Sequence, residues 1–435
     1  MSKNVYAHIK AYLEKDIYPF HMPGHKRNPR FLPEGLANFD ITELPGMDVL
    51  GKPTGMLQEM QIKIASFFGA DESFFLVNGS SAGIVAAICA TCTENDTLYA
   101  ARNGHVSMFN GLVMSGAKPN YIQPQQRPDG LVGGLTVNDL EKSGYKAGGT
   151  VYIVSPTYEG FTSDITTLAE YIHQQNGILI VDEAHGAHFP FHRAFPQTAL
   201  EGGADIVINS LHKTLPTMGQ TAVLHTQGNR VNRNQLRFFI NAMQTTSPSY
   251  LLMAAADYAL DILWKNPGLF ETYVQQLKQF RTEMETAGIP PVPTDDIGKL
   301  LFETEDAEET AAIMARDYKV QVEMAQGRHL LAMTSVADTE EGFARLRTAL
   351  QSLLSGKRGK KTGATPPNPS PVPQLPEIII NPREAVRQPT VILPVQQAQG
   401  QIAVELIAPC PPGIIQIAPG ERISEELDLI YVAHQ

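Results

Sequence analysis

The feature that most constrains the fold is an alternation of short apolar runs with helical segments, from about residue 56 to residue 210. The runs are continuous and rich in β-branched residues, a pattern typical of strands covered on both faces. Strands that alternate with helices predict a mostly parallel sheet with right-handed crossovers, hence an α/β fold. The strands are expected at 74–77, 151–154, 178–181 and 205–209, and the helices at 5–13, 56–68, 84–92 and 165–174.

Polar side chains follow four of the predicted strands, at Asn78, Ser155, Asp182 and Ser210. The carboxyl ends of parallel strands meet at one edge of a sheet, and ligands of open α/β sheets bind at that edge. We therefore expect the functional site where these four positions converge.

Changes in the content of proline, glycine and charged residues predict five regions along the chain. The segment 356–361 reads Gly-Lys-Arg-Gly-Lys-Lys and is followed by five prolines up to residue 373, a composition typical of an extended linker. The regions are an N-terminal arm (1–50), a large domain (51–245), a helical connection with a small α/β domain (246–354), the linker (355–376) and a C-terminal segment (377–435).

Charge and apolar content exclude several classes of protein as first hypotheses. Lys and Arg total 34 and Asp and Glu total 45, a net charge of −11, whereas nucleic-acid binding needs clustered cations. No apolar run approaches the roughly 18 residues of a membrane helix, and no secretory leader is evident at the start. Three cysteines argue against a disulfide framework. We expect a cytoplasmic globular protein without nucleic-acid or membrane partners.

A lysine and an aspartate at two strand ends form the most informative pair. Asp182 ends one apolar strand, and Lys213 follows the next in Ser-Leu-His-Lys-Thr. Burial disfavours the ammonium form of such a lysine and makes it a good Schiff-base nucleophile. A carboxylate nearby suits the pyridinium nitrogen of pyridoxal 5′-phosphate (PLP). The Gly79-Ser80-Ser81 turn before a helix offers a phosphate seat, so the combination predicts a PLP enzyme.

A zinc hydrolase is an alternative interpretation of the same region. Asp182, His185, His188 and His192 are closely spaced and include potential zinc ligands. Pro190 interrupts the helical spacing between the last two histidines, which weakens this hypothesis.

At these residues the sequence resembles the Orn/Lys/Arg decarboxylase family, in its compact bacterial form. The resemblance implies PLP fold type I, like that of aspartate aminotransferase. It is carried by several long motifs: His-Met-Pro-Gly-His-Lys at 21–26, Asp-Ile-Thr-Glu-Leu-Pro-Gly-Met-Asp at 40–48, Phe-Leu-Val-Asn-Gly-Ser-Ser-Ala-Gly at 75–83, Arg-Asn-Gly-His-Val-Ser at 102–107, Ser-Pro-Thr-Tyr at 155–158, 181–188, 210–214, Thr-Ser-Pro-Ser-Tyr at 246–250, and Pro-Pro-Gly and Pro-Gly-Glu at 411–413 and 419–421.

Carried over to these positions, the resemblance implies a role for each site residue. Lys213 would form the Schiff base, Asp182 would hold the pyridinium and His105 would stack on the ring. His185 would lie near the cofactor 3-hydroxyl or the substrate carboxylate. Glu421 would meet the distal cation of the substrate, with Glu43 and Asp48 as weaker candidates. The remaining cofactor contacts would be Ser80, Ser81, Thr157, Ser210 and His212, and His212 or Lys213 would reprotonate Cα.

The activity implied by the resemblance is α-decarboxylation of a basic amino acid by a homodimer or larger assembly. Arginine is favoured, followed by lysine or ornithine, and the product would be a polyamine or a precursor such as agmatine. An aminotransferase is an alternative that needs an arginine for the α-carboxylate, for which Arg328 is the candidate. A non-catalytic regulatory homologue is a further alternative.

Overall fold

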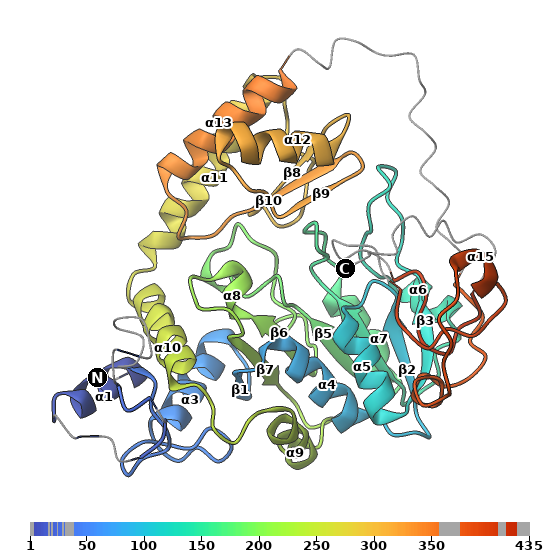
Figure 1. Cartoon of the computed structure of the whole chain (residues 1–435), viewed down its shortest axis with the longest axis horizontal. Coiled ribbons are helices and arrows are strands. Elements are labelled where there is room, and N and C mark those ends of the chain that lie inside the picture. Colours follow the sequence, from blue (N-terminus) through green and yellow to red (C-terminus); the bar gives the residue numbers. More distant parts are fainter. Residues whose placement is uncertain are drawn as a thin grey trace.

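The computed structural model describes residues 4–15, 18, 21–23, 25–27, 30, 39–355, 375–407 and 415–423. Its largest element is a seven-stranded sheet in the order β1-β7-β6-β5-β4-β2-β3 (Figure 1). The strands are β1 (Glu72–Leu76), β2 (Thr97–Ala101), β3 (Lys118–Ile122), β4 (Thr150–Val154), β5 (Ile178–Asp182), β6 (Ile206–Ser210) and β7 (Ala222–Thr226).

Strand direction confirms the prediction of a mostly parallel sheet. The strands β3, β2, β4, β5 and β6 pair in parallel, whereas β7 is antiparallel to both β6 and β1. Strand β1 therefore runs in the same direction as β6. As a result, Asn78, Ser155, Asp182 and Ser210 all lie at one edge of the sheet, as expected.

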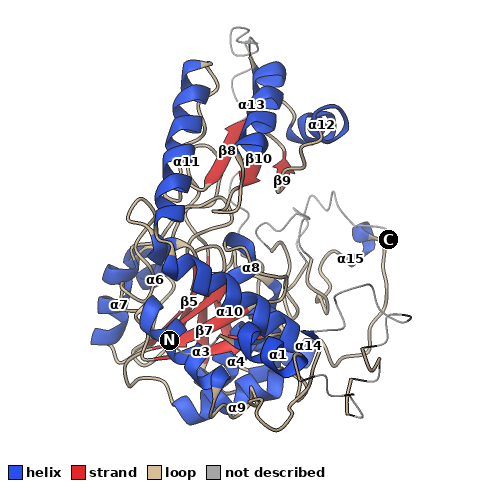
Figure 2. Ribbon diagram, turned by 90° about the vertical axis from the view of Figure 1, so that its left-hand side faces the viewer, coloured by secondary structure: helices blue, strands red, loops and turns tan. Residues whose placement is uncertain are grey.

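Helices cover both faces of the sheet (Figures 1 and 2). In β5, Ile180 belongs to one buried apolar cluster, while Leu179 and Val181 belong to the other, because successive side chains point to opposite faces. One cluster is closed by α3 (Met56–Phe68), α6 (Val137–Lys142), α7 (Ile165–Gln174) and α10 (Tyr250–Lys265); the other is closed by α4 (Gly79–Thr91), α5 (Val106–Ser115) and α9 (Arg233–Met243). Burial on both faces explains why the strands are apolar without a break.

A second, smaller unit follows α10 and lies above the large sheet in Figure 1. Its antiparallel sheet has the order β8-β10-β9. The elements are α11 (Gly268–Thr286), β8 (Lys299–Glu303), α12 (Ala307–Ile313), a π-helical turn (Met314–Tyr318), β9 (Met324–Gln326), β10 (His329–Met333) and α13 (Glu340–Leu354). This unit matters for the site because β8 begins with a buried lysine.

Residues 4–13 and the described residues from 375 onward include segments that pack on the large unit. Helix α1 (Val5–Leu13), which has the predicted bounds, docks on α10, where Asp257 accepts a hydrogen bond from the amide of Val5 at 2.7 Å. The C-terminal segment contains α14 (Pro382–Ala385) and α15 (Val395–Ala398), and Asn381 donates to the carbonyl of Gly116 after α5. Residues 356–374 of the predicted linker lie outside the described residues. Within the described part of the chain, no helix is both long and apolar enough to cross a membrane.

Candidate active site

Lys213 lies in α8 (Leu211–Thr214), the single helical turn that follows β6. Its Nζ is 3.1 Å from Nε2 of His185. Burial lowers the pKa of Lys213, while the negative charges of Asp182 and Glu323 partly offset this effect. The lowered pKa increases the fraction of neutral amine, which is the nucleophilic form.

Asp182 ends β5, the strand that neighbours β6 in the sheet. Only 3% of the residue is exposed, and its carboxylate accepts hydrogen bonds from the hydroxyl of Tyr152 (2.8 Å) and the amide of Ala184 (3.1 Å). Burial, and then the charge of Asp182, raise the pKa of Tyr152 well above 10, so Tyr152 remains a phenol that donates. We did not anticipate Tyr152 from the sequence, because an aromatic residue within a strand is usually a core residue.

His185 lies between two lysines. Its Nε2 faces Lys213, and its Nδ1 is 2.8 Å from Nζ of Lys299. Burial, followed by the positive charges of Lys299 and Lys213, holds the pKa of His185 well below 6.5. The imidazole is therefore neutral at pH 7.

Lys299 is the principal site residue that the sequence analysis missed. It opens β8 in the small unit and is 1% exposed. Burial lowers its pKa to about 8, although Asp296 acts in the opposite direction. The available signal was a lysine at the start of the apolar run Leu300-Leu301-Phe302, the same kind of signal that singled out Lys213.

The amino end of α4 forms a cradle at the same sheet edge. The predicted turn at 78–83 is instead the beginning of α4, which starts at Gly79, and its N-cap residue Asn78 makes no side-chain capping bond to the first turn. The hydroxyl of Ser210 donates to that of Ser80 at 2.8 Å, and Ser81 lies in the same first turn. Amides of a first helical turn, together with hydroxyls, are typical ligands of a phosphate.

The other predicted cofactor contacts have identified partners in the structure. His105 caps α5 and accepts a hydrogen bond from the amide of Ser107. The Nδ1–H group of His212 donates to the carbonyl of Thr221 at 2.9 Å. The hydroxyl of Thr157 accepts from the amide of Phe161 and closes the turn after β4. These bonds fix the three side chains but do not themselves test a cofactor role.

The histidines of the zinc hypothesis point to different partners. His188 pairs with Asp296 (3.1 Å), and His192 pairs with Glu271 (2.9 Å), while His185 faces the two lysines. No group of three or more His, Cys, Asp or Glu among the described residues could hold a metal ion. The geometry therefore does not support zinc binding by Asp182 and these histidines.

The chain matches the major domain of the Orn/Lys/Arg decarboxylases over residues 4–309 and their C-terminal domain over residues 371–433. The chain belongs to the Orn/Lys/Arg decarboxylase family.

Curated members of the family resemble this decarboxylase-family chain over most of its length. An arginine decarboxylase of Bacillus anthracis is 29% identical, with 94% of this chain and 88% of the relative aligned. An arginine decarboxylase of Bacillus subtilis is 27% identical, with 97% and 91% aligned. The lysine decarboxylase LdcA of Pseudomonas aeruginosa is 24% identical, but only 56% of this chain and 37% of the relative align.

Solved structures of other proteins share the fold of this chain. Lysine decarboxylase A from Pseudomonas aeruginosa has a TM-score of 0.80 at 20% identity, covering 96% of this chain and 74% of that chain. A structure of SPT with PLP has a TM-score of 0.59 at 16% identity, covering 81% and 84%. The chain thus has the α/β fold shared by these proteins.

The acidic residues that were expected to contact the substrate are bonded to other groups of the protein. Both oxygens of Glu421 pair with the guanidinium of Arg102 at 2.6 and 2.8 Å, and neither residue is more than 1% exposed. Asp48 accepts hydrogen bonds from amides that precede and begin α3, including that of Gly55 at 2.7 Å. Glu43 accepts from the hydroxyl of Thr42. The expectation that Glu421 contacts the distal cation of the substrate is therefore not supported.

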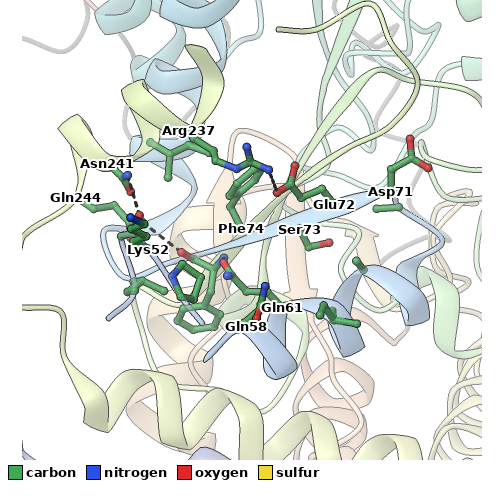
Figure 3. A pocket seen from close by; sticks show the side chains of 18 of the residues that line it. Lys52, Gln58, Gln61, Asp71, Glu72, Ser73, Phe74, Arg237, Asn241 and Gln244 are labelled. Carbon is green, nitrogen blue, oxygen red and sulfur yellow. Dashed lines mark hydrogen bonds and ion pairs between the residues drawn. The ribbon is translucent and has the colours of Figure 1, made fainter. Parts of the chain in front are cut away.

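A cavity of about 620 Å³ lies beside edge strand β1, between α3 and α9 (Figure 3). Gln61 and Gln244 of its wall accept hydrogen bonds from the amides of Phe75 and Val77 at 2.8 Å. The two glutamine side chains therefore satisfy backbone amides on the outer side of the edge strand. Free amides at such an edge could otherwise pair with a strand of another chain. None of the described residues that line this cavity belongs to the cluster around Lys213, so we assign the chemistry to the strand-end site.

Proposed function

We propose that the protein is a PLP-dependent decarboxylase of a basic amino acid, with arginine the favoured substrate and agmatine and CO₂ the products. Lysine and ornithine are the next candidates. The observation that carries this proposal is the cluster of Lys213, Asp182 and His185 at one sheet edge, in which Asp182 and His185 are buried and Lys213 is half-buried. Arginine is favoured because relatives that align with this chain over most of their length are named arginine decarboxylases.

The donor set of the site fits PLP. Lys213 would hold the cofactor as a Schiff base, Asp182 would pair with its ring nitrogen, and His105 would stack on the ring. Ser80, Ser81 and Ser210 with the first turn of α4 would hold the phosphate. When bound, PLP supplies an electron sink for the pair left behind by CO₂.

The residues of this chain control protons and charge around the reacting centre. The carboxylate of Asp182 is buried and fixed by hydrogen bonds from Tyr152 and Ala184, and there it would stabilise the cationic ring nitrogen of the cofactor. Lys213 is the proposed group that returns a proton to the substrate carbon. The Nδ1 proton of His212 is engaged by the carbonyl of Thr221, which makes His212 the weaker of the two predicted donors.

Glu323 replaces Glu421 as the proposed acceptor of the substrate's distal cation. It is exposed and lies directly before β9, and its carboxylate accepts a hydrogen bond from Tyr158 at 2.6 Å. The ring of Tyr158 packs edge-on against His185, with centroids 5.1 Å apart. The negative charge of Glu323 also acts to raise the pKa of both Lys213 and Lys299, against the effect of burial.

Glu323→Gln is expected to raise the KM for arginine with a smaller change in kcat. The variant loses one charge-assisted contact of about 1.5–3 kcal/mol, equivalent to roughly a 10- to 100-fold rise in KM. Steady-state kinetics of agmatine formation measure both constants. Glu305→Gln, an exposed carboxylate in the same unit, is the control and is expected to behave as the unmodified protein. An unchanged KM in Glu323→Gln would remove Glu323 from the substrate site.

A product assay with arginine, lysine and ornithine tests the proposed function. We expect one amine and one CO₂ per amino acid consumed, with the highest kcat/KM for arginine. Formation of a keto acid without CO₂ would instead favour the aminotransferase, although its candidate Arg328 is exposed in the turn between β9 and β10. Bound PLP without turnover of any of the three would favour a regulatory homologue.

We further propose a cytoplasmic homodimer that supplies polyamine synthesis and binds neither nucleic acid nor membranes. The predicted regions 1–50, 51–245, 246–354, 355–376 and 377–435 likewise remain proposals as domain boundaries. Light scattering of the purified protein tests the dimer, for which a mass of twice 47.6 kDa is expected.

A further inference from the structure

Lys299 reaches the site from the small unit, and its position is fixed by a specific contact between the two units. The loop before β8 docks on the turn after β4, where the amide of Asp296 donates to the carbonyl of Gly160 at 3.0 Å. Asp296 also pairs with His188 and accepts from the amide of Gly298 at 2.9 Å. The aliphatic stem of Lys299 lies directly against Gly160.

Gly160 is required for this approach. Its φ is +103°, and a Cβ at this position would lie 2.7 Å from Cγ of Lys299. The close contact directs the amine of Lys299 toward the ring of His185 rather than toward solvent. The amine of Lys299 therefore lies 2.8 Å from His185, and His185 in turn contacts Lys213.

We propose that Lys299 is a positioning residue: it donates a hydrogen bond to Nδ1 of His185 and thereby fixes the neutral ring with its proton on Nε2, facing Lys213. An ammonium group can only donate, so the nitrogen that it contacts must be an acceptor. The single ring proton is then on Nε2, 3.1 Å from Nζ of Lys213, and the ring donates it when the Lys213 amine is in its neutral form. The inference rests on the proposed role of Lys213.

The charges around His185 also oppose its protonation. Lys299 on β8, Lys213 on α8, His188 on the loop of His185 itself and His105 at the start of α5 all lower the pKa of His185, in addition to its burial. Asp182, Asp296, Glu159 and Glu323 are the acidic groups near this cluster. Removal of the Lys299 charge therefore raises the pKa of His185, and protonation then occurs as the pH falls through the raised value.

Lys299→Met removes both the donor and the charge and is the decisive variant. Long-range proton–nitrogen NMR of the full chain with labelled histidine, before PLP is added, reports the tautomer of His185, which His185→Gln identifies in the spectrum. We expect the native protein to hold the Nε2–H form, and Lys299→Met to lose that preference and raise the pKa of His185 by about one unit or more. In the PLP-loaded enzyme, the acid limb of the kcat profile should move upward by the same amount.

Three further variants separate the possible explanations. Lys299→Arg retains a charged donor and should preserve the Nε2–H form, whereas Lys299→Gln retains a neutral donor and should preserve the tautomer but raise the pKa. Lys278→Met, an exposed lysine of α11, is the control and should change neither. An unchanged tautomer and pKa in both Lys299→Met and Lys299→Gln would overturn the inference. Because the NMR reading needs no turnover, a native protein that failed to decarboxylate any basic amino acid would contradict the proposed function separately.

Discussion

Lys213→Ala is expected to abolish CO₂ release from arginine while the protein stays folded. The substitution removes the amine that lies 3.1 Å from His185, and no other lysine among the described residues lies at the end of β6. Loss of a residue that forms the covalent link should lower kcat by at least on the order of 10⁴-fold. The absorption band of lysine-bound PLP should disappear from the spectrum as well.

The matched control for this experiment is Lys118→Ala, at the exposed beginning of β3. It removes the same side-chain atoms from an exposed position in the same large unit and should retain both the absorption band and the activity. Circular dichroism and thermal melting verify that both variants fold. Persistent CO₂ release by Lys213→Ala, at more than about one per cent of the native rate, would contradict the assignment of Lys213.

Glu421→Gln is expected to destabilise the protein rather than weaken substrate binding. Its carboxylate neutralises Arg102, whose guanidinium also donates to the carbonyls of Ile415 and Gln416 and lies 4.7 Å from the ring centre of Tyr121. Removing one member of a buried ion pair leaves an uncompensated charge and costs about 3–5 kcal/mol of unfolding free energy. Urea unfolding monitored by fluorescence measures this loss.

The exposed ion pair between Arg422 and Glu377 is the control, because Arg422 follows Glu421 in the sequence but is not buried. Arg422 and Glu377 are 3.2 Å apart, with side chains 48% and 69% exposed, so Glu377→Gln should cost about 0–1 kcal/mol. The double variant Arg102→Met with Glu421→Leu should recover part of the stability, because it leaves no unpaired charge. A Glu421→Gln protein of native stability but with a raised KM for arginine would restore the original expectation for Glu421.

The sequence correctly predicted the position of the central pair because two local facts were sufficient. Asp182 and Lys213 each follow an apolar strand, and the carboxyl ends of parallel strands in an α/β sheet meet at one edge. This conclusion required neither the order of the strands in the sheet nor the antiparallel direction of β7. The helices at 5–13 and 165–174 were likewise predicted with their observed bounds, because their apolar periodicity is local.

Residues that act through charge pairing depend on contacts between segments that are distant in the sequence. Glu421 has the residue type of a substrate ligand, but its partner Arg102 is more than three hundred positions away, and the pairing follows from the docking of the C-terminal segment. Lys299 is one of several lysines in the sequence until the loop of Asp296 packs on Gly160 and directs its amine to His185. Tyr152 is an ordinary strand residue until β4 and β5 pair.

The sequence by itself therefore determined the α/β fold, the edge of the sheet that carries the proposed site, and the positions of Asp182 and Lys213 at that edge. These features follow from hydrophobic periodicity along short stretches of chain. The tertiary structure decided which charged groups lie near those positions, including Lys299 and Glu323, and which, like Glu421, are paired with other residues. The physical reason is that the energy of a charge depends on its burial and on neighbours within a few ångströms, and both are set only when remote segments pack together.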